Sequence, residues 1–200
     1  MGCETSVLCT LLIFFQIIGR SFEMSHDFVP IRDDLFSKCE EKPEMGYLDA
    51  FADLSNLSSK RGAGGINISG NATTIWDVDP SDVVEVDVSI LKFEGDKWIP
   101  TIIKGNVKDF CKTFFDKNTI YYSYSPKHVV NKKEVKEKCI TSPGTILVWK
   151  PYLLKISFSY AVPLNVGRHK AVIIYSAIDK AGVKRDRDIC MEIVGDIVNA

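Results

Sequence analysis

The sequence has no excess of charge of either sign. Its 25 Lys and Arg residues balance 26 Asp and Glu residues, which leaves a formal net charge of −1 over 200 residues. A chain without a strong positive field does not attract nucleic acid over a distance, so we expect no nucleic-acid partner. Proline and glycine are not in excess either, and the length with 46% hydrophobic residues fits one domain with a sizeable core.

The sequence also lacks the motifs of the common catalytic and metal sites. It contains no G-x-S-x-G, no H-E-x-x-H and no P-loop, and no cysteine pair has C-x-x-C spacing. The three histidines, His26, His128 and His169, are far apart in the sequence, and we interpret them as surface residues. We therefore expect a protein that is not an enzyme and has neither a metal nor a cofactor.

Long apolar runs are scarce, and the clearest one lies at the N-terminus. The run Val7–Ile18 is shorter than the about 20 residues that cross a bilayer. Small residues at Gly19 and Ser21 fit a signal-peptidase site, although no Lys or Arg precedes the run. We expect residues 1–21 to be a secretory signal peptide and residues 22–200 to be a single secreted, extracellular domain.

Cysteines are few, and four remain after the expected signal peptide. Three pairings of four cysteines are possible. We favour Cys111–Cys139, which closes a short loop, and Cys39–Cys190, which ties the start of the domain to its last strand. Disulfides that close loops of such lengths contribute about 3–5 kcal/mol to stability.

Three N-x-S/T sequons lie close together, at Asn56, Asn67 and Asn71. A single sequon arises easily by chance, but three behind a signal peptide indicate an exported glycoprotein. We expect this segment to lie on the solvent side of the domain.

Most of the remaining sequence has the patterning of short β-strands. Apolar and polar residues alternate through Val84–Ile90 and Leu154–Tyr160, which is typical of strands with one buried face. Further strands are expected at Ile66–Trp76, Lys97–Ile103, Lys170–Ile178 and Ile189–Ile193. Roughly seven or eight short strands separated by turns predict an antiparallel β-sandwich or barrel. We expect Phe22–Gly46 to be a loosely ordered lead-in.

One or two short helices fit within this β pattern. An apolar stripe at helical spacing predicts a helix over residues 107–115, with Asn106 as its N-cap. A second helical turn or two is expected over Lys132–Lys138. We interpret the lysines of Lys127–Lys138 as a solvated face, the alternative being contact with a partner or an anionic membrane surface.

Large aromatic side chains are the candidate lining of a ligand cavity. They are Trp76, Trp98, Phe110, Phe114, Phe115, Trp149, Phe158 and Tyr160. These residues fit two interpretations, a pocket for an apolar ligand or a dry, filled core.

Several motifs follow one another in a particular order between residues 67 and 179. They are Asn67–Trp76, the valine strand through Phe93, Trp98-Ile-Pro-Thr, Asn106–Phe115, Cys139 and Pro163–Asp179. This order resembles the insect secreted chemosensory proteins that are distantly related to the ganglioside-activator and ML lipid-recognition group. The resemblance covers roughly residues 45–195 and rests on segment order, two cysteines and aromatic spacing.

The resemblance implies a β-cup, an open antiparallel sandwich of immunoglobulin-like topology whose apolar interior accepts a lipid. It also implies a Cys111–Cys139 bridge, and the end-to-end bridge of the ganglioside activator suits Cys39–Cys190. The implied ligand is a small lipid, hydrocarbon or pheromone, bound in chemosensory detection. A chemosensory receptor or a membrane surface would be a further partner. No binding motif carries over residue by residue.

Three functions from different classes remain open. The preferred one is a secreted carrier of a small apolar ligand, which predicts a cavity of several hundred Å³. The alternative is an immunoglobulin-like interaction module that binds a receptor through its surface, which predicts a filled core and an exposed apolar patch. A lipid or glycan hydrolase is the third and would need a buried carboxylate pair or a Ser-His pair.

Overall fold

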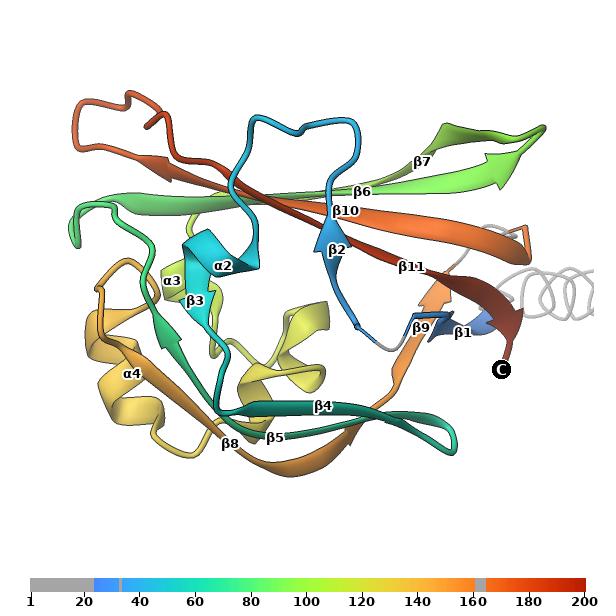
Figure 1. Cartoon of the computed structure of the whole chain (residues 1–200), viewed down its shortest axis with the longest axis horizontal. Helices are drawn as coiled ribbons and strands as arrows, with labels where there is room; N and C mark the ends of the chain where they lie inside the picture. The colour runs from blue at the N-terminus through green and yellow to red at the C-terminus, as the bar shows by residue number, and fades with distance from the viewer. Residues whose placement is uncertain (1–23, 33, 161–164) are drawn as a thin grey trace, which may run out of the picture.

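Two antiparallel β-sheets face each other in the computed structural model, which describes residues 24–32, 34–160 and 165–200 (Figure 1). The predicted antiparallel β-sandwich or cup with few short helices is therefore confirmed. The expected signal peptide, residues 1–21, lies outside the described residues. Within the part of the chain that is described, no helix has the length and apolar character needed to cross a membrane.

The first sheet has seven strands in the order β7-β6-β10-β11-β1-β9, and β2 also pairs with β11. Their bounds are β1 Met24–Pro30, β2 Ser37–Lys38, β6 Val83–Glu94, β7 Lys97–Val107, β9 Ile156–Tyr160, β10 Gly167–Ile178 and β11 Ile189–Asn199. The predicted alternation in β6 decides which face is buried, because Val84 and Val86 point into the core while Glu85 points away.

The second sheet is built around β5. Its strands are β3 Ala52–Asp53, β4 Leu57–Gly62, β5 Gly65–Thr74 and β8 Ile146–Leu154. β8 pairs along one edge of β5, while β4 and β3 pair in turn along the other. Ile66 and Ile68 are buried on the inner face, whereas Asn67 is exposed between them. Asn56 is also exposed and Asn71 is half-buried.

One length of chain passes from the second sheet to the first. β8 pairs with β5, and β9, which follows after Lys155 alone, pairs with β1. The predicted alternation of Leu154–Tyr160 is therefore split between two sheets. Leu154 and Ile156 nevertheless both point into the interior.

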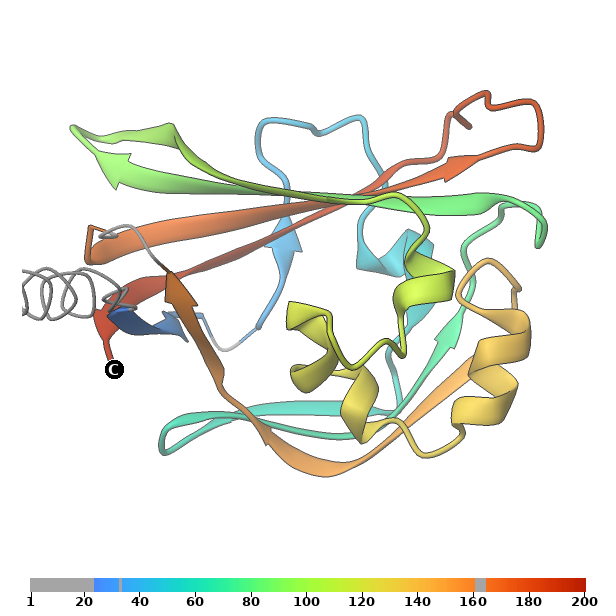
Figure 2. The same ribbon diagram turned by 180° about the vertical axis from the view of Figure 1, so that it is seen from behind.

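The helical segments lie between the two sheets on one side of the sandwich (Figure 2). They are α3 Phe110–Thr113, η1 Ile120–Ser123, η2 Pro126–His128 and α4 Lys132–Lys138, while α2 Leu48–Phe51 lies on the other side. The helix predicted over residues 107–115 is shorter than expected. Asn106 belongs to β7, where its amide donates to Asp87, and Asp109 is the N-cap. Pairing with β6 through Val107 accounts for the late start of α3.

The lead-in is more ordered than the sequence indicates. β1 completes the first sheet by pairing with β11 and β9, although its sequence has no sustained alternation. The structure contains the two favoured disulfides, Cys39–Cys190 and Cys111–Cys139. The second bridge links α3 to the residue that ends α4. It does not join the two sheets as the bridge of an immunoglobulin domain does.

Gly70 is a position where only glycine fits. It lies in the left-handed region with φ of +105°, at a register shift between β5 and β8. A Cβ at this position would overlap the backbone carbonyl oxygen of Asn56, which accepts a hydrogen bond from the Asn71 amide.

We predict that Gly70→Ala lowers the free energy of unfolding by at least about 2 kcal/mol, because it combines backbone strain with a steric overlap. Gly64→Ala in the same hairpin is the matched control. Gly64 also has a positive φ, but open space surrounds the position of its missing Cβ, so its loss should be about 1 kcal/mol. Urea denaturation measures both, and equal losses would contradict the packing argument.

Candidate functional site

Apolar side chains form a large buried core at one end of the sandwich. A large buried cluster there contains Trp76, Phe110 and Phe114, and Phe51 and Tyr175 pack against it. The ring of Phe110 lies 5.2 Å from that of Phe114 and 5.6 Å from that of Tyr175 between centroids. This end agrees with the interpretation of these aromatic residues as part of a filled core.

The predicted cavity-lining residues therefore divide between different places. Phe115 and Trp149 pack against the large cluster beside Trp76, Phe110 and Phe114. Trp98 departs from the prediction, because β7 places it on the outer face of the first sheet, 5.0 Å from the Lys170 Nζ. Phe158 lies at the opposite end of the interior. The side chain of Tyr160 lies outside the described part of the chain.

At that opposite end, the apolar faces of the two sheets remain separate clusters. Phe28, Ile193 and Ile197 form one on the first sheet. Ile66, Ile68 and Leu154 form the other on the second sheet. Two half-buried residues, Leu35 and Ile156, touch both clusters. The inner faces therefore approach each other here without merging into one buried core.

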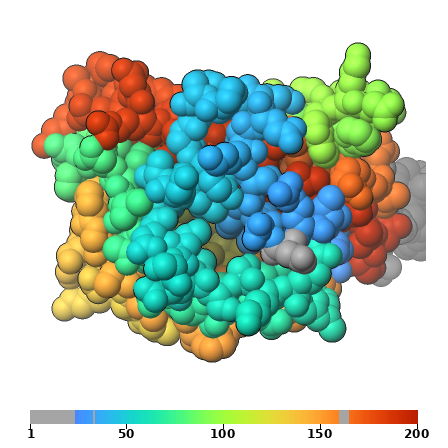
Figure 3. Space-filling view, in the orientation of Figure 1, coloured from blue at the N-terminus to red at the C-terminus, as the bar shows by residue number. Residues whose placement is uncertain are grey.

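The surface is hollowed over this part of the interior. Figure 3 shows the hollow between the blue lead-in and the teal segment around β4, with the yellow helical segment visible at its bottom. Leu35 belongs to the lead-in, and Leu57 of β4 and Tyr124, next to η1, both pack against the cluster on the second sheet. We call the region between the two clusters the interior hollow and define it by half-buried side chains that pack against one or both of them, namely Leu35, Leu57, Tyr124, Ile156 and Phe158.

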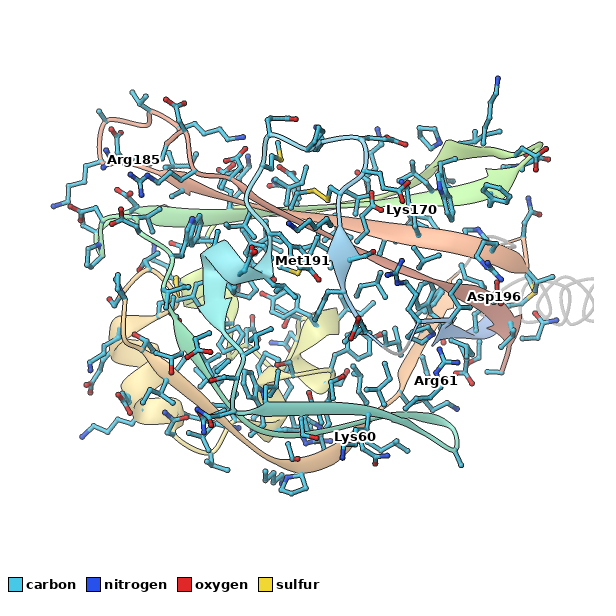
Figure 4. All side chains as sticks on the ribbon, viewed as in Figure 1. Lys60, Arg61, Lys170, Arg185, Met191 and Asp196 are labelled. Carbon is cyan, nitrogen blue, oxygen red and sulfur yellow. A yellow bond between two sulfur atoms is a disulfide. The ribbon has the colours of Figure 1, made fainter. Side chains whose placement is uncertain are left out.

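Polar contacts hold the rim of the interior hollow. Arg61 of β4 reaches toward the lead-in (Figure 4) and donates hydrogen bonds to the carbonyl oxygens of Pro30, at 2.5 Å, and Arg32, at 3.2 Å. The Tyr124 hydroxyl donates to the Ser157 carbonyl at 2.8 Å. These contacts connect the edge of the second sheet to the lead-in and the helical segment to β9.

The interpretation of the histidines as surface residues is wrong for two of the three. His26 and His169 are buried, with 1% and 3% of their surface exposed. The His169 Nδ1 lies 2.9 Å from the Gly167 carbonyl oxygen. His128 is half-buried, and its ring stacks on Tyr152 with centroids 3.8 Å apart. Strand pairing turns His26 of β1 and His169 of β10 inward, and the spacing of the histidines in the sequence did not indicate this.

A second hollow, of about 710 Å³, lies outside the sandwich interior. It runs between Gly46–Ala50 and the loop Lys184–Asp188, beside Trp76. Its lining is rich in charge and includes Glu44 and Asp186 as well as three ion pairs, Arg185 with Asp82, Arg187 with Asp77 and Lys184 with Asp188, which suits an apolar ligand poorly. The interior hollow is therefore the better candidate for an apolar ligand.

The described residues contain no group of three or more His, Cys, Asp and Glu side chains arranged to hold a metal ion. The chemistry of the interior hollow comes instead from aliphatic and aromatic surface. Of its residues, Ile156 and Phe158 could be found from the alternation in the sequence. Leu35 and Tyr124 had no pattern that marked them.

Burial predicts a pH dependence at His128. Removal from water lowers the pKa of His128 below its ordinary value of 6.5, and burial also raises the pKa of its stacking partner Tyr152 to about 12. His128 therefore takes up a proton near pH 6.5 in the unfolded chain but only at a lower pH in the folded protein. Stability from this group is present above pH 6.5 and is lost as the pH falls toward the lowered pKa.

We predict that His128→Phe, which keeps the ring stack and removes the titration, loses less stability than the original protein between pH 7.5 and pH 5. Urea denaturation across this range measures the difference. Parallel stability curves for the two proteins would contradict the prediction.

Comparisons with known proteins give a weak likeness to a solved structure. No family model matches the chain, and no curated protein matches it. A solved structure, described as a Niemann-Pick type C2 protein from Japanese carpenter ant, is 14% identical and covers 84% of this chain and 97% of its own. Its TM-score of 0.22 is too low to carry an argument about this protein.

Proposed function

We propose that this protein is a secreted, non-enzymatic carrier that takes a small apolar ligand between its two sheets. The observation that supports it is the pair of apolar clusters, one on each sheet, that face each other across the interior hollow without merging. A ligand placed there would cover both inner faces at once.

Burial of apolar surface would supply the affinity. The half-buried side chains Leu35, Ile156 and Phe158 keep part of their apolar surface in water while the hollow is open. Each Å² that a ligand covers contributes about 25 cal/mol before the costs of association. Entry would take place between β4 and the lead-in, where Arg61 holds the rim.

The finer proposal concerns the ligand and its setting. The ligand is a lipid, hydrocarbon or pheromone, and the setting is chemosensory detection outside the cell. The resemblance of segment order to insect chemosensory proteins supports this setting. The two disulfides support an oxidising, extracellular compartment.

We predict that Leu35→Trp weakens binding of the fluorescent apolar probe N-phenyl-1-naphthylamine at least tenfold, because the larger ring occupies the interior hollow. Ile102→Trp is the matched control, since Ile102 lies on β7 with 78% of its surface exposed. Fluorescence titration measures both. Equal binding by the two variants, or no binding of the probe by the original protein, would contradict the proposal.

A carrier should also leave its producing cell with part of its cargo. We predict that native mass spectrometry of the secreted protein detects an added mass that organic extraction removes. Gas chromatography of the extract should then identify a lipid or hydrocarbon. Protein that is free of any extractable apolar molecule, from every host tested, would count against the proposal.

A further inference from the structure

His26 is a buried polar side chain that has no partner. Only 1% of its surface is exposed, and neither ring nitrogen has a hydrogen-bond partner within the described structure. A buried polar group without a hydrogen bond is costly, so proteins rarely retain one that serves no purpose. The other buried histidine differs, because the His169 Nδ1 already lies within hydrogen-bond distance of the Gly167 carbonyl.

The position of His26 directs its ring into the sandwich. His26 and Phe28 lie two residues apart on β1 and share a face, and Phe28 belongs to the buried cluster of the first sheet. His26 is also in register with Phe158 of β9, and their ring centroids are 6.0 Å apart. His26 therefore lies on the inner face, beside a residue that defines the interior hollow.

The side chains that lie between the interior hollow and His26 are apolar. Leu35 and Ile156 border the hollow and pack against the cluster that contains Phe28. Phe158 follows Ile156 by two residues on the same inner face of β9 and packs against the same cluster. A linear ligand that enters between β4 and the lead-in would thus contact these apolar side chains first and the imidazole last.

The chemistry of the free imidazole selects the kind of head group. A neutral imidazole presents one N–H donor and one acceptor nitrogen. A hydroxyl group can either accept from the N–H or donate to the acceptor nitrogen, whereas a pure hydrocarbon can do neither. We propose that His26 binds the terminal hydroxyl of a long-chain alcohol, with the alkyl chain lying in the interior hollow. This inference rests on the proposed carrier function.

The test compares two ligands of equal chain length, 1-dodecanol and dodecane, as competitors for N-phenyl-1-naphthylamine. The original protein should bind 1-dodecanol at least tenfold more tightly than dodecane, although the alcohol is the less hydrophobic of the two. His26→Phe should weaken 1-dodecanol at least tenfold, which corresponds to 1.4 kcal/mol, and leave dodecane within about twofold.

His169→Phe is the matched control, because it removes a buried histidine that already has a partner and should leave the preference for alcohol unchanged. Circular dichroism verifies that both variants fold. Should His26→Phe fail to fold, nitrogen NMR of the original protein labelled at histidine replaces it. Addition of 1-dodecanol should then shift the ring resonances of one histidine, and dodecane should not.

The outcomes separate the two proposals. Equal affinity of the original protein for 1-dodecanol and dodecane overturns the role of His26 and leaves the carrier function standing. The same holds if His169→Phe loses as much affinity for 1-dodecanol as His26→Phe does, or if no histidine resonance responds. Failure of the original protein to bind the probe and both competitors overturns the carrier function itself.

Discussion

The crossing of one strand from the second sheet to the first fixes the geometry on which the rest of the interior depends. β8 and β9 are separated by Lys155 alone, so the two sheets are joined covalently by the shortest of connections at this point. Side chains beside this crossing pack against both sheets. Leu154 belongs to the cluster of the second sheet and Ile156 touches both clusters. The crossing thus joins the two apolar faces along one side, while the face toward β4 and the lead-in is hollowed (Figure 3).

The opposite end is closed by different means, and the contrast explains why the hollow persists. Phe110 of α3 and Phe114 at its end belong to the buried core between the sheets, where Phe110 contacts both Phe114 and Tyr175 of β10. The Cys111–Cys139 bridge holds this segment against the end of α4. Close packing of this kind is stiff, so the filled end can hold the sheets apart while the other end stays open. A binding site needs such a support, because a core that was soft throughout would collapse onto its own cavity.

The sequence predicted what depends on local periodicity and missed what depends on long-range pairing. Alternation in Val84–Ile90 located β6, and cysteine order gave both disulfides. β1 escaped because its pattern is short and its order comes from pairing with β11 and β9, which lie more than a hundred residues away. For the same reason Trp98 could not be assigned to the outer face, since that depends on the register between β7 and β6. Leu35 carried no signal at all, because it lies in an irregular segment that only the folded chain brings over the hollow.

Two buried polar sites on the first sheet show how differently such groups can be used. On its outer face, Lys170 is 1% exposed, but its Nζ lies 3.0 Å from Glu192 Oε1 and 5.0 Å from the Trp98 ring centroid. Burial raises the pKa of Glu192, while the Lys170 ammonium acts against that rise. This pair supplies its own partners and needs no ligand. On the inner face, His26 has comparable burial and no partner. In natural proteins, buried polar groups without a hydrogen-bond partner tend to occur at functional sites, where a bound ligand can supply the missing hydrogen bond. The contrast between the satisfied Lys170–Glu192 pair and the unsatisfied His26 ring on one sheet is what supports the proposed role of His26 in ligand binding.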